Sequence, residues 1–162
     1  MAEPSRVSMT PSARNAAERP LHADRARALD PAIAIRDEAL DHFVERDGMR
    51  FAGTHLIVDL WEAHALDDLA VVETALRDAT EAAGATLLNI DLHRFTPNGG
   101  ISGVAVLAES HISIHSWPER AYAAVDVFMC GDAAPHRAIE VLRRAFRPRR
   151  LTIAEHKRGV LP

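Results

Sequence analysis

The spacing of hydrophobic residues along the chain predicts two amphipathic helices. In residues 67–83, hydrophobic side chains recur every three or four positions, and Gly84 follows where a helix often ends. Residues 135–146 repeat this spacing and stop before Pro148, which disfavours a helical residue in front of it. Each pattern places its hydrophobic residues on one face, so both helices are expected to pack against a common core.

The other hydrophobic segments are short and typical of β-strands. Their Val, Ile and Leu residues alternate with polar residues or form brief runs between turn signals such as Pro-Asn-Gly-Gly at 97–100. The connections between the middle segments are too short for helical crossovers, so these strands should run antiparallel. We therefore predict an α+β fold, a two-layer α/β sandwich with helices packed on one face of a largely antiparallel sheet. The predicted strands are residues 54–61, 86–95, 101–109, 111–116, 122–129 and 151–155.

A change in composition near residue 50 divides the chain into two parts. Residues 1–50 form an N-terminal extension with few large hydrophobic residues, so we predict that it is mostly disordered. A short amphipathic helix is predicted within it over residues 31–46, ended by Asp47-Gly48. Residues 51–162 should form one domain, because a chain of 162 residues can build one sizeable core.

Charge and composition exclude several classes of partner. The net charge of -4 argues against a nucleic-acid partner held by bulk charge. No hydrophobic run approaches the ~20 residues needed to cross a bilayer, and the first thirty residues lack a hydrophobic signal core, so neither a membrane partner nor export is expected. Cys130 is the only cysteine, and a lone thiol fits a reducing compartment. We therefore predict a cytoplasmic protein.

Residues 109–119, Glu-Ser-His-Ile-Ser-Ile-His-Ser-Trp-Pro-Glu, are the densest run of reactive side chains. A zinc site is disfavoured, because His111 and His115 would lie about 13 Å apart on a strand. A serine hydrolase is disfavoured too, because no Gly-x-Ser-x-Gly motif surrounds Ser110 or Ser113. Taken one at a time, these residues would also suit the solvent face of a half-buried strand, so only their combination is informative.

That combination resembles the bacterial S-adenosylmethionine decarboxylase proenzymes. The resemblance covers about residues 51–159, and its most specific block is residues 109–119. The block continues through Tyr-Ala-Ala-Val-Asp-Val-Phe at 122–128 and Cys-Gly at 130–131. Further matches are His-Arg-Phe at 93–95, Ile-Ser-Gly-Val at 101–104 and Glu-His-Lys-Arg-Gly at 155–159.

The resemblance implies a pyruvoyl-dependent, self-cleaving decarboxylase. Ser110 would attack the carbonyl of Glu109, and the chain would be cut between them into a β chain (1–109) and an α chain (110–162). Ser110 would thereby become a pyruvoyl group, which holds the substrate amine as a Schiff base, and no metal would be needed. The resemblance assigns the base for processing to His115, assistance in processing to Ser102, and the proton donor in the decarboxylation to Cys130. A thiol with a pKa of roughly 8.5 is mostly protonated at neutral pH and can supply that proton.

The resemblance also implies the substrate and the assembly. Phe95 and Phe51 match positions that stack on adenine, and Glu119 matches the acid that binds the ribose hydroxyls. The substrate would then be S-adenosylmethionine, and the product would supply spermidine biosynthesis. Two alternatives stay open: a pyruvoyl-dependent arginine or ornithine decarboxylase, and a non-catalytic homologue. The resemblance further implies a homo-oligomer of processed protomers, which we expect to be a dimer.

The spacing between Ser110 and His115 adds a geometric condition. The two residues are five positions apart, an odd number, so a regular strand would point them to opposite faces. If one site uses both, the chain must bend between them or Ser110 must lie in the turn before the strand. We predict that Ser110 lies in the turn, with Ser102, His115 and Cys130 gathered around the cut.

Overall fold

The computed structural model describes residues 42–162. The predicted disordered extension and the predicted helix over 31–46 therefore lie mostly outside the described residues. The last five residues of that predicted helix are described, and the last three of these form a strand, β1 (Val44–Arg46). This strand pairs in antiparallel fashion with β2 (Met49–Phe51) across a two-residue turn. Asp47 and Gly48 in that turn both have positive φ values, 53° and 72°, as the favoured hairpin turns require. The Asp-Gly pair thus closes a hairpin instead of ending a helix.

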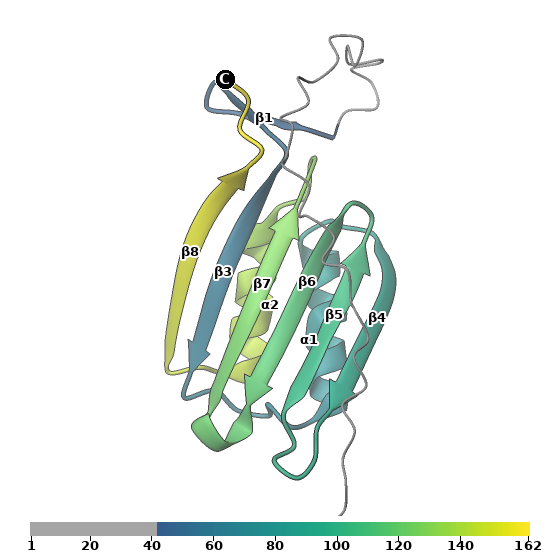
Figure 1. Cartoon of the computed structure of the whole chain (residues 1–162), viewed down its shortest axis with the longest axis vertical. Coiled ribbons are helices and arrows are strands. Elements are labelled where there is room, and N and C mark those ends of the chain that lie inside the picture. Colours follow the sequence, from purple (N-terminus) through teal and green to yellow (C-terminus); the bar gives the residue numbers. More distant parts are fainter. Residues whose placement is uncertain (1–41) are drawn as a thin grey trace, which may run out of the picture. The chain divides into compact units, whose positions relative to one another are not determined.

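A six-stranded antiparallel sheet forms one layer of the domain (Figure 1). Its strands lie in the spatial order β4-β5-β6-β7-β3-β8, and every neighbouring pair is antiparallel. The predicted α+β sandwich is confirmed. The strands are β3 (Gly53–Trp61), β4 (Leu87–Arg94), β5 (Ile101–Leu107), β6 (Ser110–Trp117), β7 (Tyr122–Met129) and β8 (Arg150–Arg158).

Two helices, α1 (Leu69–Ala82) and α2 (Pro135–Phe146), form the second layer behind the sheet in Figure 1. Asp68 caps α1, since its carboxylate accepts hydrogen bonds from the amides of Ala70 and Val71. Gly84 follows that helix with a φ of 73°, a left-handed conformation that glycine adopts without strain. No helix among the described residues is long and apolar enough to span a membrane.

The hydrophobic core fills the space between the sheet and the helices. Alternate residues of the central strands β3, β6 and β7 point towards the helices, which meet them with the apolar faces predicted from the sequence. The fully buried residues include Leu56, Val58, Leu60, Ile112, Ile114, Val127, Leu76, Leu142 and Phe146. The residues between these inward-facing positions lie on the other side of the sheet, which we call the open face.

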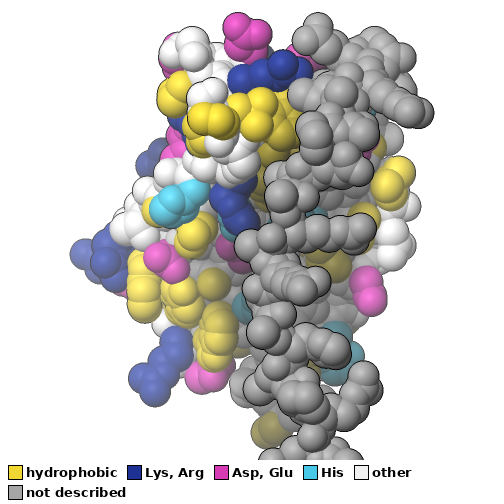
Figure 2. Space-filling model, turned by 45° about the horizontal axis from the view of Figure 1, so that its top comes forward, with side chains coloured by type: hydrophobic (Ala, Val, Ile, Leu, Met, Phe, Trp, Pro, Cys, Tyr) yellow, Lys and Arg dark blue, Asp and Glu magenta, His cyan; other side chains and the backbone are white. Residues whose placement is uncertain are grey.

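The open face is turned to the viewer in Figure 1, and no described helix covers it. It carries apolar side chains as well as histidines and charged groups, and Figure 2 shows hydrophobic, basic, acidic and histidine side chains interspersed on a tilted view of this side. Ile57, Val106 and Trp117 are each about two-fifths exposed there. Covering these three side chains with a partner would remove apolar area from water.

Ser116 connects the start of β5 to the loop before α1. Its buried hydroxyl accepts a hydrogen bond from the amide of Ile101 at 2.8 Å and donates one to the carbonyl of Leu66 at 2.7 Å. We expect Ser116→Ala to lower the free energy of unfolding by about 1–3 kcal/mol, because both backbone groups would lose their partner. Urea denaturation measures this loss. Ser116→Thr keeps the hydroxyl and should retain most of the stability, and equal losses in both variants would contradict the explanation.

Candidate functional site

The Glu109–Ser110 bond joins a tight turn to the start of β6. Leu107 and Ser110 pair as the last and first residues of β5 and β6, and Ala108 and Glu109 make the turn between them. Glu109 has a φ of 57°, a left-handed conformation that is strained for a residue other than glycine. The prediction that Ser110 itself lies in the turn is wrong by one residue, since Ser110 begins the strand and Glu109 carries the unusual backbone conformation.

Cys130 contacts both residues of this bond. Its thiol donates a hydrogen bond to the main-chain carbonyl of Glu109, with Sγ 3.1 Å from the oxygen. Its amide donates a hydrogen bond to Ser110 Oγ at 3.2 Å. Ser110 is about nine-tenths buried on the helix-facing side of β6. The structure therefore brings together the predicted proton donor, the predicted nucleophile and the carbonyl that this nucleophile would attack.

The surroundings of Cys130 keep its thiol protonated. Burial raises the pKa of the Cys130 thiol above its ordinary value, and the negative charge of Glu109 raises it further, while a hydrogen bond involving Ser110 has the opposite, smaller effect. A raised pKa favours the S–H form at neutral pH. That form can donate a hydrogen bond or a proton, whereas a thiolate cannot.

Ser102 and His115 form a second group, at the other end of β6. Ser102 Oγ lies 2.8 Å from His115 Nδ1, and the two residues are paired across β5 and β6. His115 belongs to the open face, while Ser110 points towards the helices. Ser110 and His115 are also five residues apart on β6, which corresponds to about 17 Å along the strand. Within one protomer the structure therefore places Cys130 at the predicted cut, but not Ser102 or His115.

The predicted substrate-binding residues divide between these two ends. Phe95 follows β4 beside the paired residues His93 and Ser102, and 47% of its surface is exposed. Glu119 is exposed in the short 3-10 helix η2 (Pro118–Arg120) that follows β6. Both therefore lie at the Ser102–His115 end. A depression of about 330 Å³ on the open face there is lined by Asp91, His93, Ser102, Gly103, Val104, Ser113 and His115.

Phe51 occupies a different environment from Phe95. It ends β2 and is fully buried, with Lys157 Nζ 5.4 Å from the centre of its ring. A base can stack only on an accessible ring face. In this structure Phe51 therefore packs as a buried side chain, and its adenine-stacking role stays a prediction.

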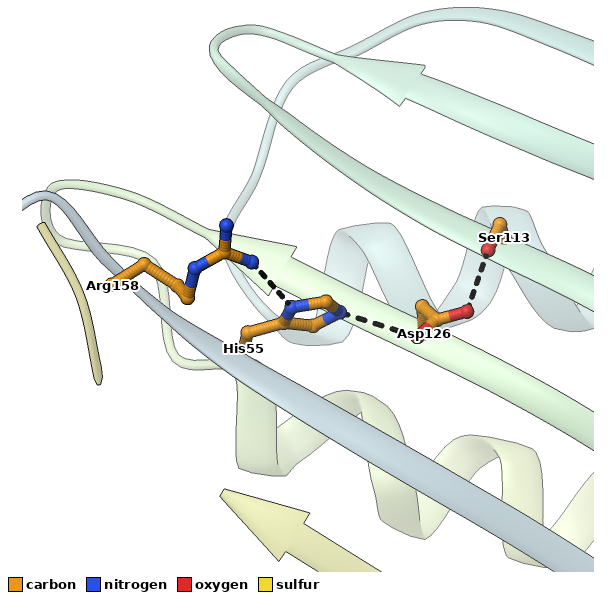
Figure 3. Close-up of polar contacts among 4 residues, drawn as sticks. All are labelled: His55, Ser113, Asp126 and Arg158. Atoms are coloured by element: carbon orange, nitrogen blue, oxygen red, sulfur yellow. Dashed lines mark hydrogen bonds and ion pairs between the residues drawn. The ribbon is translucent and has the colours of Figure 1, made fainter. Parts of the chain in front are cut away.

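A polar network crosses the open face next to the Ser110 end of β6 (Figure 3). Arg158 donates to His55 Nδ1, so the ring hydrogen is on Nε2, which donates to Asp126 at 3.2 Å. Ser113 donates to the other oxygen of Asp126 at 3.2 Å. The network thereby connects side chains from β8, β3, β7 and β6.

His111 lies beside this network and directly follows Ser110. Its ring approaches Phe128 and His55, with centroids 5.7 and 6.3 Å away. Burial lowers the pKa of His111 below its ordinary value and His55 lowers it further, while Asp126 acts in the opposite direction. The neutral imidazole is therefore favoured next to the Glu109–Ser110 bond.

Reasoning from the sequence missed the network of His55, Asp126 and Arg158. These residues lie on three different strands, and only the strand register brings them together. Their signals in the sequence are polarity next to hydrophobic residues and, for Asp126 and Arg158, a place in the matched blocks at 122–128 and 155–159. Asp126 lies between two valines of a predicted strand, and His55 directly precedes the apolar run of residues 56–58.

Comparison with known proteins identifies relatives over most of the chain. A sequence profile of S-adenosylmethionine decarboxylase matches residues 54–159. The S-adenosylmethionine decarboxylase proenzyme of Thermomicrobium roseum is 48% identical over 114 residues, which are 70% of this chain and 98% of that protein. The corresponding proenzyme of Methanococcus aeolicus is 51% identical over 114 residues, 68% of this chain and 97% of that protein. The crystal structure of an adenosylmethionine decarboxylase from Aquifex aeolicus superposes with a TM-score of 0.64 at 34% identity, covering 69% of this chain and 94% of that chain.

Proposed function

Because the chain belongs to the S-adenosylmethionine decarboxylase family, we propose that it cuts itself between Glu109 and Ser110, converts Ser110 into a pyruvoyl group and decarboxylates S-adenosylmethionine. The observation that carries this proposal is the contact of Cys130 with both sides of the bond, through its thiol to Glu109 and its amide to Ser110. The decarboxylated product would supply aminopropyl groups for spermidine biosynthesis.

The proposed cut uses the hydroxyl of Ser110. Oγ attacks the Glu109 carbonyl carbon, the peptide C–N bond breaks, and an ester and a free amine at Ser110 result. Removal of the Ser110 α-proton then expels the Glu109 carboxylate and leaves a dehydroalanine at position 110. Water replaces its nitrogen by oxygen, and ammonia leaves. The hydrogen bond from the Cys130 thiol supports the first step, because it stabilises negative charge on the attacked carbonyl oxygen.

The residues around position 110 fit a pyruvoyl group. Ser110 is largely buried, so the group would be shielded from bulk water, and Cys130 lies beside it as a protonated thiol. When formed, the pyruvoyl group supplies a ketone that withdraws electrons from the substrate as carbon dioxide leaves. The Cys130 thiol can then donate a proton to the carbon from which carbon dioxide has left.

From the position of His115 we infer that each site is built from two protomers. Removal of the Ser110 α-proton requires a base within hydrogen-bonding reach, and His115 of the same protomer is about 17 Å away along the strand. A second protomer packed against the open face can bring its own Ser102 and His115 to the cleavage end of the first. Phe95 and Glu119 would accompany them, because they lie at the same end of the sheet as His115. Each complete site would thus combine two half-sites.

Exposed apolar side chains among the polar groups of the open face support this dimer. Ile57, Val106 and Trp117 are exposed on it, and the ring of Trp117 stacks on Tyr122 at a centroid distance of 5.3 Å. A second copy of the chain would bury these side chains, which removes apolar area from water. Burial raises the pKa of Tyr122 to about 12, with its hydrogen bond to Asp59 as the next cause, so this phenol stays neutral in such an interface.

Mass spectrometry and a substrate assay test the proposal. The intact mass of the purified chain should show two fragments, residues 1–109 and a smaller fragment that begins with a blocked residue 110. Offered S-adenosylmethionine, arginine and ornithine, the protein should release carbon dioxide from S-adenosylmethionine. An uncut chain of 162 residues would refute the self-cleavage, and carbon dioxide released only from an amino acid would refute the substrate.

A further inference from the structure

His42, two residues before β1, contacts the residue that precedes the proposed cut. His42 Nε2 lies 3.2 Å from Glu109 Oε1. The main-chain carbonyl of His42 accepts a hydrogen bond from the amide of Gly131 at 3.0 Å. His42 precedes residue 54, where the match to the family begins, so this contact comes from the N-terminal extension.

The two contacts of His42 restrain both sides of the scissile carbonyl. The side chain holds Glu109, whose carbonyl accepts the hydrogen bond from the Cys130 thiol. The main chain holds Gly131, the residue directly after Cys130. His42 therefore connects the turn that carries the carbonyl to the loop that carries its hydrogen-bond donor. Without His42, the turn and the loop would be linked by that hydrogen bond, by the hydrogen bond from the Cys130 amide to Ser110 Oγ, and by the pairing of β6 with β7.

We propose that His42 is a positioning residue for self-cleavage, which keeps the strained Glu109 carbonyl against the thiol of Cys130. This inference rests on the proposed function, since it concerns the same bond. His42 acts through Glu109, because its described polar contacts are with Glu109 and Gly131. It gives part of the N-terminal extension a role in the maturation of the enzyme.

The expected effect is modest because the pair is exposed. The side chains of His42 and Glu109 are 61% and 53% exposed, so water and salt screen their interaction. We expect His42→Ala to slow the cut about two- to fivefold. His42→Gln should stay within about twofold of the unchanged chain, because the Gln amide can still donate to the Glu109 carboxylate.

Cell-free synthesis of the full-length chain gives the rate of the cut. Synthesis is stopped, and the fractions of whole chain and of the fragments 1–109 and 110–162 are followed by gel and intact mass. The matched control is His136→Ala, since His136 forms an exposed pair with Glu155 at 3.1 Å between α2 and β8, away from the cut. This control removes a comparable His–Glu pair and should leave the rate unchanged. Thermal unfolding of each variant reports any general loss of stability.

The outcomes separate this inference from the function on which it rests. A slower cut in His42→Ala, rescue by His42→Gln and no effect of His136→Ala would support it. In an E109Q background, His42→Ala should cause little further slowing, because its partner is already altered. A wild-type rate in His42→Ala, or equal slowing in His136→Ala, would overturn the role of His42 while the cut itself stands. A chain that stays whole in every sample would refute the self-cleavage and this inference with it.

Discussion

Ser110→Ala will give a folded, uncut chain with decarboxylase activity lowered by at least about a thousandfold. The loss should be this large because the methyl group offers neither a nucleophile for the cut nor an oxygen from which the pyruvoyl group can form. Folding should survive, since Ser110 Oγ makes one described hydrogen bond, which it accepts from the Cys130 amide. Intact mass shows whether the chain is uncut, and circular dichroism shows whether it is folded. Carbon dioxide release from S-adenosylmethionine measures the activity.

Ser116→Ala is the matched control for Ser110→Ala. Ser116 is also a buried serine on the helix-facing side of β6, and its hydroxyl makes two hydrogen bonds. The control should therefore lose at least as much stability, yet it should still be cut and active below its unfolding temperature. If Ser110→Ala decarboxylated S-adenosylmethionine, or if Ser116→Ala also stayed whole while folded, the role assigned to Ser110 would be wrong.

Elements with a strong hydrophobic pattern were predicted from the sequence with the correct bounds. The end of a strand that depends on main-chain pairing with a distant strand was not. The bounds predicted for α2 and β7 are those observed, because both segments have unambiguous periodicity. β8 was predicted to end at residue 155 and continues to Arg158. Its outer residues are mostly exposed and polar, and their pairing with β3 extends the strand. That pairing joins residues about a hundred positions apart, which periodicity cannot show.

The sequence predicted which residues belong to the candidate site better than it predicted how they are arranged. The resemblance supplied Ser110, Cys130, Ser102 and His115 together. The odd spacing correctly indicated that Ser110 and His115 point to opposite faces of one strand. We expected a bend or a turn to bring Ser110 and His115 together. β6 has neither, because it is a regular strand from Ser110 to Trp117. The alternation rule was sound, and within the described protomer it keeps Ser110 and His115 apart, which is why we propose that two protomers share the site.

A mixed dimer of Ser110→Ala and His115→Ala chains will cut its His115→Ala chain, although neither variant cuts itself alone. Each homodimer lacks one necessary group, and loss of a general base typically slows its step by about 10²- to 10⁴-fold. In the mixed dimer, one site combines Ser110 of the His115→Ala chain with His115 of the Ser110→Ala chain. That site has both groups, so it should mature, and the dimer should reach about half the activity of the unchanged protein.

Two different affinity tags allow this dimer to be isolated after co-expression. Purification over both resins in turn retains mixed dimers, and intact mass then shows which of the two chains is cut. The control dimer pairs His115→Ala with a chain carrying both substitutions. It has the same Ser110 but no His115, so it should remain whole. If His115 acted on Ser110 of its own chain, both mixed dimers would stay uncut, and the two half-sites seen at opposite ends of β6 would not belong to one catalytic centre.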